Sequence, residues 1–193
     1  MPITDPPFIH ALARVEDGVA VGRGTKVWAG AHLRAGARIG AECVIGSDVT
    51  IDPDVVVGDR CKIQNAALLY RGVSLGNGVF IGPGAILTND RRPRAVAPDG
   101  ALLADGDWAI AGIVVEDGAS IGANATVVAG TRIGAWSMVG AGAVVTHDVG
   151  PHELVVGVPG RRVGAVCMCG QTTDSAGEIT CAACGRRFTV APA

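Results

Sequence analysis

An aliphatic residue recurs at every sixth position through most of this 193-residue chain. The series runs without a miss from Ile9 to Leu87, resumes at Val115 and continues to Val145, giving twenty six-residue units. Four residues after each aliphatic position stands a second residue, which is mostly small. A unit this short cannot bury an apolar face by folding back on itself, so neighbouring units must stack to form one continuous core.

The repeat predicts an all-β fold, a parallel β-helix in which three units form one coil and twenty units form about seven coils. The aliphatic residues and the small residues point inward and fill a narrow prism. Glycine often follows the aliphatic residue, and we expect it there because the corners need backbone freedom. These glycines are Gly22, Gly40, Gly46, Gly58, Gly76, Gly82, Gly122, Gly134 and Gly140.

Cys43 and Cys61 occupy the small inward position exactly one predicted coil apart, at a spacing of eighteen residues. We expect them to stack directly on each other as two buried thiols. A disulfide fits the spacing, but it is not expected in a reducing compartment.

Composition excludes some classes of function. The formal net charge is only -2, so the chain is not expected to bind nucleic acid or other polyanions. No apolar run approaches membrane-spanning length, and residues 1–5 lack the basic start of a signal peptide. We therefore expect a cytoplasmic protein without membrane association.

The repeat breaks between Leu87 and Val115, whose separation of 28 residues is not a multiple of six. A loop of residues 88–112 is therefore expected to leave the β-helix, and insertions of this length are usually functional or disordered. It begins with the sequence TNDRRPR, in which three arginines stand beside an asparagine and an aspartate. This composition favours a clamp for a phosphorylated ligand. The alternative is an ordinary solvated loop.

After residue 149 the hexapeptides stop, and residues 150–165 are expected to cover the last coil of a β-helix spanning 8–149. Arg161 and Arg162 then lie near the end of the prism. They are candidates for contacts to a phosphate, with plain surface charge as the alternative.

The C-terminal tail, residues 166–190, contains two pairs of cysteines, and a glycine follows each pair. Thiolates in this pattern are typical of a tetrahedral zinc site, and the glycines permit tight turns around the metal. We predict a small zinc-ribbon-like tail; the alternative is a set of redox-active cysteines or cysteines without a shared role. Four thiolates leave no open coordination position, so the zinc would be structural. The predicted ligands are Cys167, Cys169, Cys181 and Cys184.

The repeat, the extruded loop and the segment 140–164 (GAGAVVTHDVGPHELVVGVPGRRVG) resemble the left-handed β-helix, or hexapeptide, acyltransferases over about residues 8 to 166. Within that group, KVW at 26–28 with His32, KIQN at 62–65, TNDxxPR at 88–94 and GANAT at 122–126 resemble the N-acetyltransferases of nucleotide-linked 3-amino sugars. The tail sequence VGAVCMCG is similar to an extension found in some members.

The resemblance implies a left-handed winding and a homotrimer with active sites between neighbouring prisms. It implies acetyl-CoA as the acyl donor and a UDP- or dTDP-linked 3-amino sugar as the acceptor, which would enter under the loop. Asn89 matches the position near the sugar amine and would orient it, while His32 is the candidate general base. The alternative to a base is an amine that binds already neutral.

The remaining site residues implied by the resemblance are contacts to substrate and cofactor. Short runs of glycine and alanine would let the pantetheine arm approach the backbone. The substrate-binding candidates are Arg94, Asp90, Gln64 and Asn65, and the cofactor-binding candidates are Gly122, Ala123, Gly140, Ala141, Arg161 and Arg162.

Three other functions are alternatives to this one. The γ-class carbonic anhydrases share the fold, and His147 and His152 have the five-residue separation of two of their metal ligands. The third ligand would fall near Ala111, however, which argues against that class. An acetyltransferase with a different acceptor, and a β-helix that binds without catalysis, stay open as alternatives.

Overall fold

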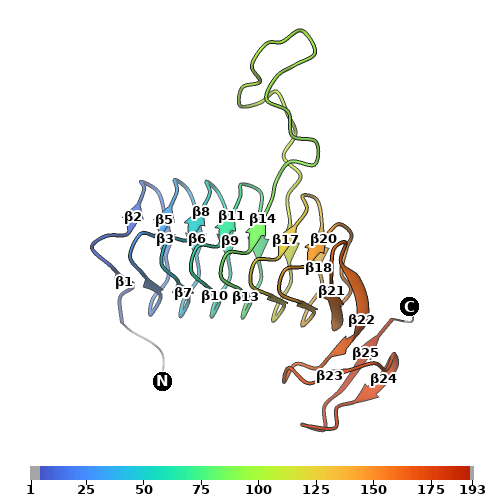
Figure 1. Ribbon diagram of the computed structural model, residues 1–193. Helices are drawn as coiled ribbons and strands as arrows, with labels where there is room; N and C mark the ends of the chain where they lie inside the picture. The colour runs from blue at the N-terminus through green and yellow to red at the C-terminus, as the bar shows by residue number, and fades with distance from the viewer. Residues whose placement is uncertain (1–4, 192–193) are drawn as a thin grey trace.

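The structure, a computed structural model, describes residues 5–191 as three parallel β-sheets wound into one solenoid (Figure 1). Residues 1–4, most of the segment expected to lack the start of a signal peptide, are outside the described residues. The predicted all-β parallel solenoid is confirmed, and the two-residue strands coincide with the aliphatic positions of the repeat. Across residues 5–191 there is no helix long and apolar enough to cross a membrane.

Each sheet forms one face of the prism. Face 1 consists of β1 (Phe8–Ile9), β4 (Lys26–Val27), β7 (Val44–Ile45), β10 (Lys62–Ile63), β13 (Phe80–Ile81), β16 (Ser120–Ile121) and β19 (Met138–Val139). Face 2 consists of β2 (Arg14–Val15), β5 (His32–Leu33), β8 (Thr50–Ile51), β11 (Leu68–Leu69), β14 (Ile86–Leu87), β17 (Thr126–Val127) and β20 (Val144–Val145). Face 3 consists of β3 (Ala20–Val21), β6 (Arg38–Ile39), β9 (Val56–Val57), β12 (Ser74–Leu75), β15 (Val114–Val115) and β18 (Arg132–Ile133).

The core is a continuous column of the inward residues of all three faces, and most of them are buried. The exceptions lie at the N-terminal end, where Ile9 and Val15 of the first coil are 42% and 36% exposed. Cys43 and Cys61 are both buried, and the backbone N–H of Cys61 donates to Cys43 Sγ at 3.4 Å. The two thiols therefore stack as predicted and form no disulfide.

The glycines that follow the aliphatic residues have a different role from the one expected. They do not have positive φ; the positive φ values fall two residues later in the corners, for example at Gly24 and Gly142. A Cβ on Gly58 would lie 2.6 Å from the backbone of Gly76 in the next coil. Glycine is needed there because consecutive coils approach too closely for any side chain, and not because of backbone freedom.

Residues 88–112 leave the solenoid at the corner between faces 2 and 3 and project away from the coils (Figure 1). Stacking resumes without a change of register, because Leu75 pairs with Val115 and Leu87 with Val127. The loop has its own small turn, in which Val96 and Leu102 form an antiparallel bridge.

The C-terminal segment extends face 1. Strand β21 (Glu153–Val156) pairs in parallel with β19, and β22 (Arg161–Val166) pairs with β21 in antiparallel register. Strand β23 (Thr172–Thr173) follows β22 in the same sheet. Strands β24 (Gly177–Thr180) and β25 (Arg187–Val190) form a separate two-stranded sheet. Because β22 crosses the expected boundary at residue 165, the capping segment and the tail share a strand.

Candidate active site and candidate metal centre

A groove of about 340 Å³ lies between the extruded loop and the corner that joins faces 2 and 3. The corner contributes residues from successive coils, and the loop contributes residues from its returning arm. The lining residues are Arg34, Asp52, Pro53, Arg71, Asn89, Asp105, Gly106, Trp108 and Ile110. The groove therefore collects polar groups that are far apart in the sequence.

Asn89 lies at the base of the loop, where the backbone is well fixed. The hydroxyl of Thr88 donates to the carbonyl of Val127 at 3.1 Å and accepts from the N–H of Ala129 at 2.9 Å. The carbonyl of Asn89 accepts from the N–H of Ala111 at 2.9 Å, which joins the two arms of the loop. The half-buried Asn89 side chain thus stands on a rigid base beside the groove.

The groove contains nearly balanced charge. Arg34 donates to Asp52 at 2.8 Å, and Asp52 also accepts from the backbone N–H of Arg71 at 3.1 Å. Arg71 in turn donates to Asp54 at 2.7 Å. The hydrogen bond that Arg34 donates to the Asp52 carboxylate raises the pKa of Arg34, so this guanidinium is held charged. Asp105 adds a further carboxylate from the loop side.

His32 lies on β5 of face 2 and does not line this groove. Its Nε2 is 2.6 Å from Glu16 Oε1. The backbone N–H of Ala35 and the His32 ring both lower the pKa of Glu16. Along face 2, His32 lies three coils before Asn89, which corresponds to a separation of roughly 14 Å along the prism. The structure does not bring these two predicted catalytic residues together within one chain.

Asp90 and Arg94, the predicted substrate contacts of the loop, are also outside the groove lining. Asp90 accepts from the backbone N–H of Arg92 at 2.7 Å, which stabilises the local turn. Arg94 is exposed and donates to the carbonyl of Pro93 at 2.9 Å.

Gln64 and Asn65 lie at a different corner, between faces 1 and 2. Asn65 Oδ1 accepts from the backbone N–H of Ser47 in the preceding coil at 3.0 Å. At the corner between faces 3 and 1, Asp59 and Asn77 make the same kind of contact to the N–H groups of Ala41 and Asp59. The structure therefore gives Asn65 a role in joining coils, on the other side of face 2 from Asn89.

The glycine-alanine corners predicted to bind the cofactor also lie between faces 1 and 2. A Cβ on Gly122 would lie 2.4 Å from the backbone nitrogen of Ala141 in the next coil. On Gly140, a Cβ would lie 2.8 Å from a methyl group of Val156. The contact at Gly122 matches that at Gly58, so close coil stacking alone accounts for glycine there, whereas at Gly140 the crowding comes from the side chain of Val156.

Gly122→Ala should therefore lower the free energy of unfolding by about 1–3 kcal/mol, because the added methyl group must displace the next coil. Gly58→Ala is the matched control at another corner, and we expect a loss of similar size. Denaturant unfolding of both variants measures this. A Gly122→Ala variant of unchanged stability that binds acetyl-CoA more weakly would contradict the stacking role.

Arg161 and Arg162 differ in their surroundings at the end of the solenoid. Arg162 is only 18% exposed and donates to Glu153 at 3.4 Å and to the carbonyl of Ala191 at 2.6 Å. Arg161 is exposed and borders a cavity of about 190 Å³ together with His147 and Asp148. Of the predicted pair, only Arg161 has a guanidinium facing solvent.

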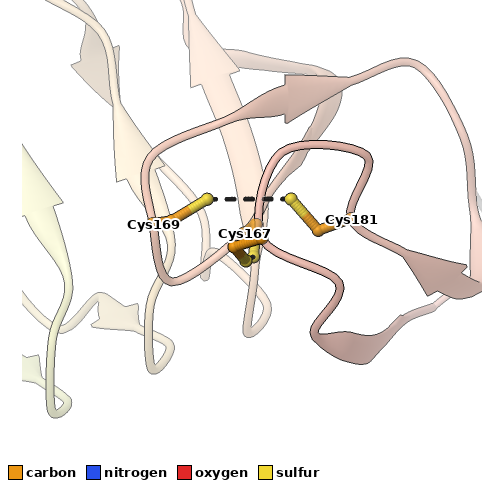
Figure 2. A group of neighbouring side chains, drawn as sticks. Cys167, Cys169 and Cys181 are labelled. Atoms are coloured by element: carbon orange, nitrogen blue, oxygen red, sulfur yellow. Dashed lines mark hydrogen bonds between the residues drawn. The ribbon is translucent and has the colours of Figure 1, made fainter.

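The four cysteines of the tail converge, as the sequence predicts (Figure 2). All four sulfurs lie within 4.8 Å of one another, with Cys167 to Cys184 at 3.6 Å and Cys169 to Cys181 at 3.7 Å. Zinc–sulfur bonds of about 2.3 Å in a tetrahedron place sulfurs about 3.8 Å apart, so the spacing fits Zn²⁺. A disulfide would need about 2.05 Å.

Two tight turns hold these sulfurs in place. The N–H of Gly170 donates to the carbonyl of Cys167 at 2.8 Å, and the N–H of Gly185 donates to that of Cys181 at 2.9 Å. Both glycines have positive φ, at 90° and 72°, a conformation that most other residues adopt only with strain. The turns are therefore preorganised for a metal with sulfur ligands.

Comparison with known proteins agrees with the repeat. The family described as bacterial transferase hexapeptide (six repeats) matches residues 36–69 and 112–147, on both sides of the extruded loop. Together the two matches cover 70 of the 193 residues, and the chain resembles this family in its stacked coils. The dTDP-3-amino-3,6-dideoxy-alpha-D-galactopyranose 3-N-acetyltransferase of Aneurinibacillus thermoaerophilus is 40% identical over 78 residues, which are 40% of this chain and 41% of that relative. The match thus spans about two fifths of the relative's length.

Solved structures share the hexapeptide-repeat fold. The acetyltransferase domain of PglB from Neisseria gonorrhoeae FA1090, in complex with acetyl coenzyme A, is 23% identical with a TM-score of 0.54 and covers 81% of this chain and 57% of that one. LpxA, a UDP-N-acetylglucosamine acyltransferase from Bacteroides fragilis 9343, is 21% identical with a TM-score of 0.67. The match covers 83% of this chain and 62% of that one. At these identities the likeness concerns the fold.

Sequence reasoning missed most of the groove in this hexapeptide-repeat chain. Arg34 and Arg71 are in ordinary corners, and Asp105 and Trp108 are in the part of the loop that has little pattern. One signal was available: Arg34 and Asp52 stand eighteen residues, or one coil, apart on the corner from which the loop emerges, and Arg71 follows at the same corner after nineteen more residues. Stacking puts such residues side by side.

Proposed function

We propose that this protein transfers an acetyl group from acetyl-CoA to the amine of a UDP- or dTDP-linked 3-amino sugar. The observation that carries the proposal is Asn89, which stands on a rigid base in a polar groove under the extruded loop. A relative named as an N-acetyltransferase of a dTDP-linked 3-amino sugar supports the choice of acceptor class.

The chemistry requires a neutral amine placed against the thioester carbonyl. Holding the two reactants in this geometry supplies much of the acceleration. The amide of Asn89 orients the amine but cannot take its proton. Backbone N–H groups of the coil would stabilise the negative charge that develops on the thioester oxygen.

The groove offers groups for both ends of such an acceptor. The carboxylates of Asp52 and Asp105 can accept hydrogen bonds from a neutral amine or sugar hydroxyls, and the guanidinium groups of Arg34 and Arg71 attract phosphate oxygens. Trp108 offers an aromatic surface for a sugar or base. Arg94 and Asp90 remain proposed contacts for the part of the acceptor that extends past the groove. Arg161 is the proposed contact to a phosphate of CoA.

We expect His32→Gln to change kcat less than about tenfold, because His32 lies about three coils from Asn89 and a general base must reach the reacting proton. The amine would then bind already neutral. Steady-state kinetics with saturating acetyl-CoA measures this. A loss of 10²–10⁴-fold would instead establish His32 as the base.

A homotrimer is the proposed assembly. The outward residues of four consecutive strands of face 2 make a mainly apolar, half-buried row beside the base of the loop, formed by Leu68, Ile86, Thr126 and Val144. Such a row favours contact with another copy of the chain. The proposal includes a cytoplasmic protein with a Zn²⁺ ion held by the four cysteines, since thiols stay reduced there.

Binding of acetyl-CoA separates this proposal from a β-helix that has lost catalysis. Calorimetric titration should give a dissociation constant between about 1 μM and 1 mM, the usual range for enzyme substrates. Absence of binding would favour the non-catalytic alternative. Binding without turnover of any amino sugar would favour a different acceptor.

A further inference from the structure

The tail contacts the solenoid at the last coil, and His152 is central to that contact. The carbonyl of His152 accepts from the N–H of Val166 at 2.8 Å, and its Nδ1 donates to the carbonyl of Val166 at 2.9 Å. The His152 ring lies 4.7 Å from the ring of Phe188 on β25. The residue after Val166 is Cys167, the first sulfur of the cluster.

The hairpin of β24 and β25 has little else to hold it. Within residues 5–191 it forms no backbone ladder with the solenoid sheets. Its apolar core consists of Ala165, Ile179 and Val190, with Phe188 packed against them. An isolated two-stranded hairpin is marginally stable in water, and so small a core adds little.

The cysteine cluster joins the two parts directly. Cys167 and Cys169 follow β22, which is paired to the last coil, whereas Cys181 and Cys184 stand in the turn between β24 and β25. A metal bound by all four therefore connects the solenoid end to the hairpin (Figure 2).

Arg162 also links the C-terminal end of the tail to the last coil. It is held between Glu153 of β21 and the carbonyl of Ala191, just beyond β25. If the hairpin leaves, Arg162 loses one of its two partners. Arg162 is thus placed to fasten the tail, while the neighbouring Arg161 faces solvent.

We infer that Zn²⁺ bound by the four thiolates fastens the hairpin onto the last coil through Phe188 and Arg162, and that this closure stabilises the C-terminal end of the solenoid. The inference rests on the zinc site of the proposed function and not on acetyl transfer. Metal binding by such sites is coupled to folding, so removing the ion should release the hairpin and loosen residues 150–166.

The test uses the full chain, purified with reductant, and measures zinc content and hydrogen exchange by mass spectrometry. We expect one Zn²⁺ per chain. Its removal by a chelator should speed exchange at least about tenfold in β24 and β25 and in residues 150–166. Cys169→Ser should reproduce this, and Met168→Ser, at the exposed neighbouring position, should not.

Phe188→Ala separates metal binding from docking, because it keeps all four ligands. We expect this variant to retain Zn²⁺ and still exchange faster at residues 150–166. No zinc in the reduced protein would overturn the metal site. If zinc binds but its removal leaves hydrogen exchange at residues 150–166 unchanged, the proposed stabilisation of the solenoid end by the docked hairpin is wrong. Neither readout depends on acetyl transfer, so the proposed activity is tested separately.

Discussion

Asn89→Ala should lower kcat/KM for acetyl transfer about 10²-fold, because the amine loses the group that orients it toward the thioester. The backbone at this position is fixed by Thr88 and Ala111, so the substitution should leave the loop in place. Most of the loss should appear in kcat, since binding of the rest of the acceptor depends on other groove residues. Initial rates over a range of acceptor concentrations measure both constants.

Pro98→Ala is the matched control for this experiment. Pro98 lies nine residues further along the same loop, is exposed and does not line the groove. Its rate should stay within about twofold of the unsubstituted protein, as expected for a surface change away from the reacting groups. An Asn89→Ala variant as active as the control would exclude Asn89 from the reaction.

Ile81→Ala should lower the free energy of unfolding by about 2–5 kcal/mol, because it leaves a cavity in the middle of the column. Ile81 is fully buried and stacks between Ile63 and Ile121 in the neighbouring coils. In a solenoid each coil contacts only its neighbours, so the defect also weakens the coupling between the two halves.

Phe80→Ala removes a larger side chain from the same strand, yet Phe80 faces outward and is 37% exposed. Phe80→Ala should therefore lower the free energy of unfolding less than Ile81→Ala does. Chemical denaturation of both variants gives the comparison. Equal losses would mean that the inward and outward positions of the repeat have been assigned incorrectly.

The solenoid was predictable because its determinants are local and periodic. One six-residue pattern fixes which residue of each strand points inward, as the buried positions of Ile63, Ile81 and Ile121 confirm. The four tail cysteines were predictable because their spacing carries the chemistry of the site. The role of glycine was predicted incorrectly, since the sequence does not reveal how closely Gly58 approaches the next coil.

The groove was not predictable in the same way. It depends on the path of a long loop, which brings Asp105 and Trp108 back toward Arg34 and Asn89. No periodicity specifies that return. The same limit applies to the side chains of Asn65 and Arg162. Their partners are the backbone N–H of Ser47 and the backbone carbonyl of Ala191, which are placed by coil stacking and tail docking and not by any motif.

The most direct test of the proposed function is release of the CoA thiol when the purified protein is incubated with acetyl-CoA and a panel of UDP- and dTDP-linked 3-amino sugars. We predict release that depends on one of these acceptors and is absent without it. No release with any of the sugars, from protein that binds acetyl-CoA, would contradict the proposed acceptor class.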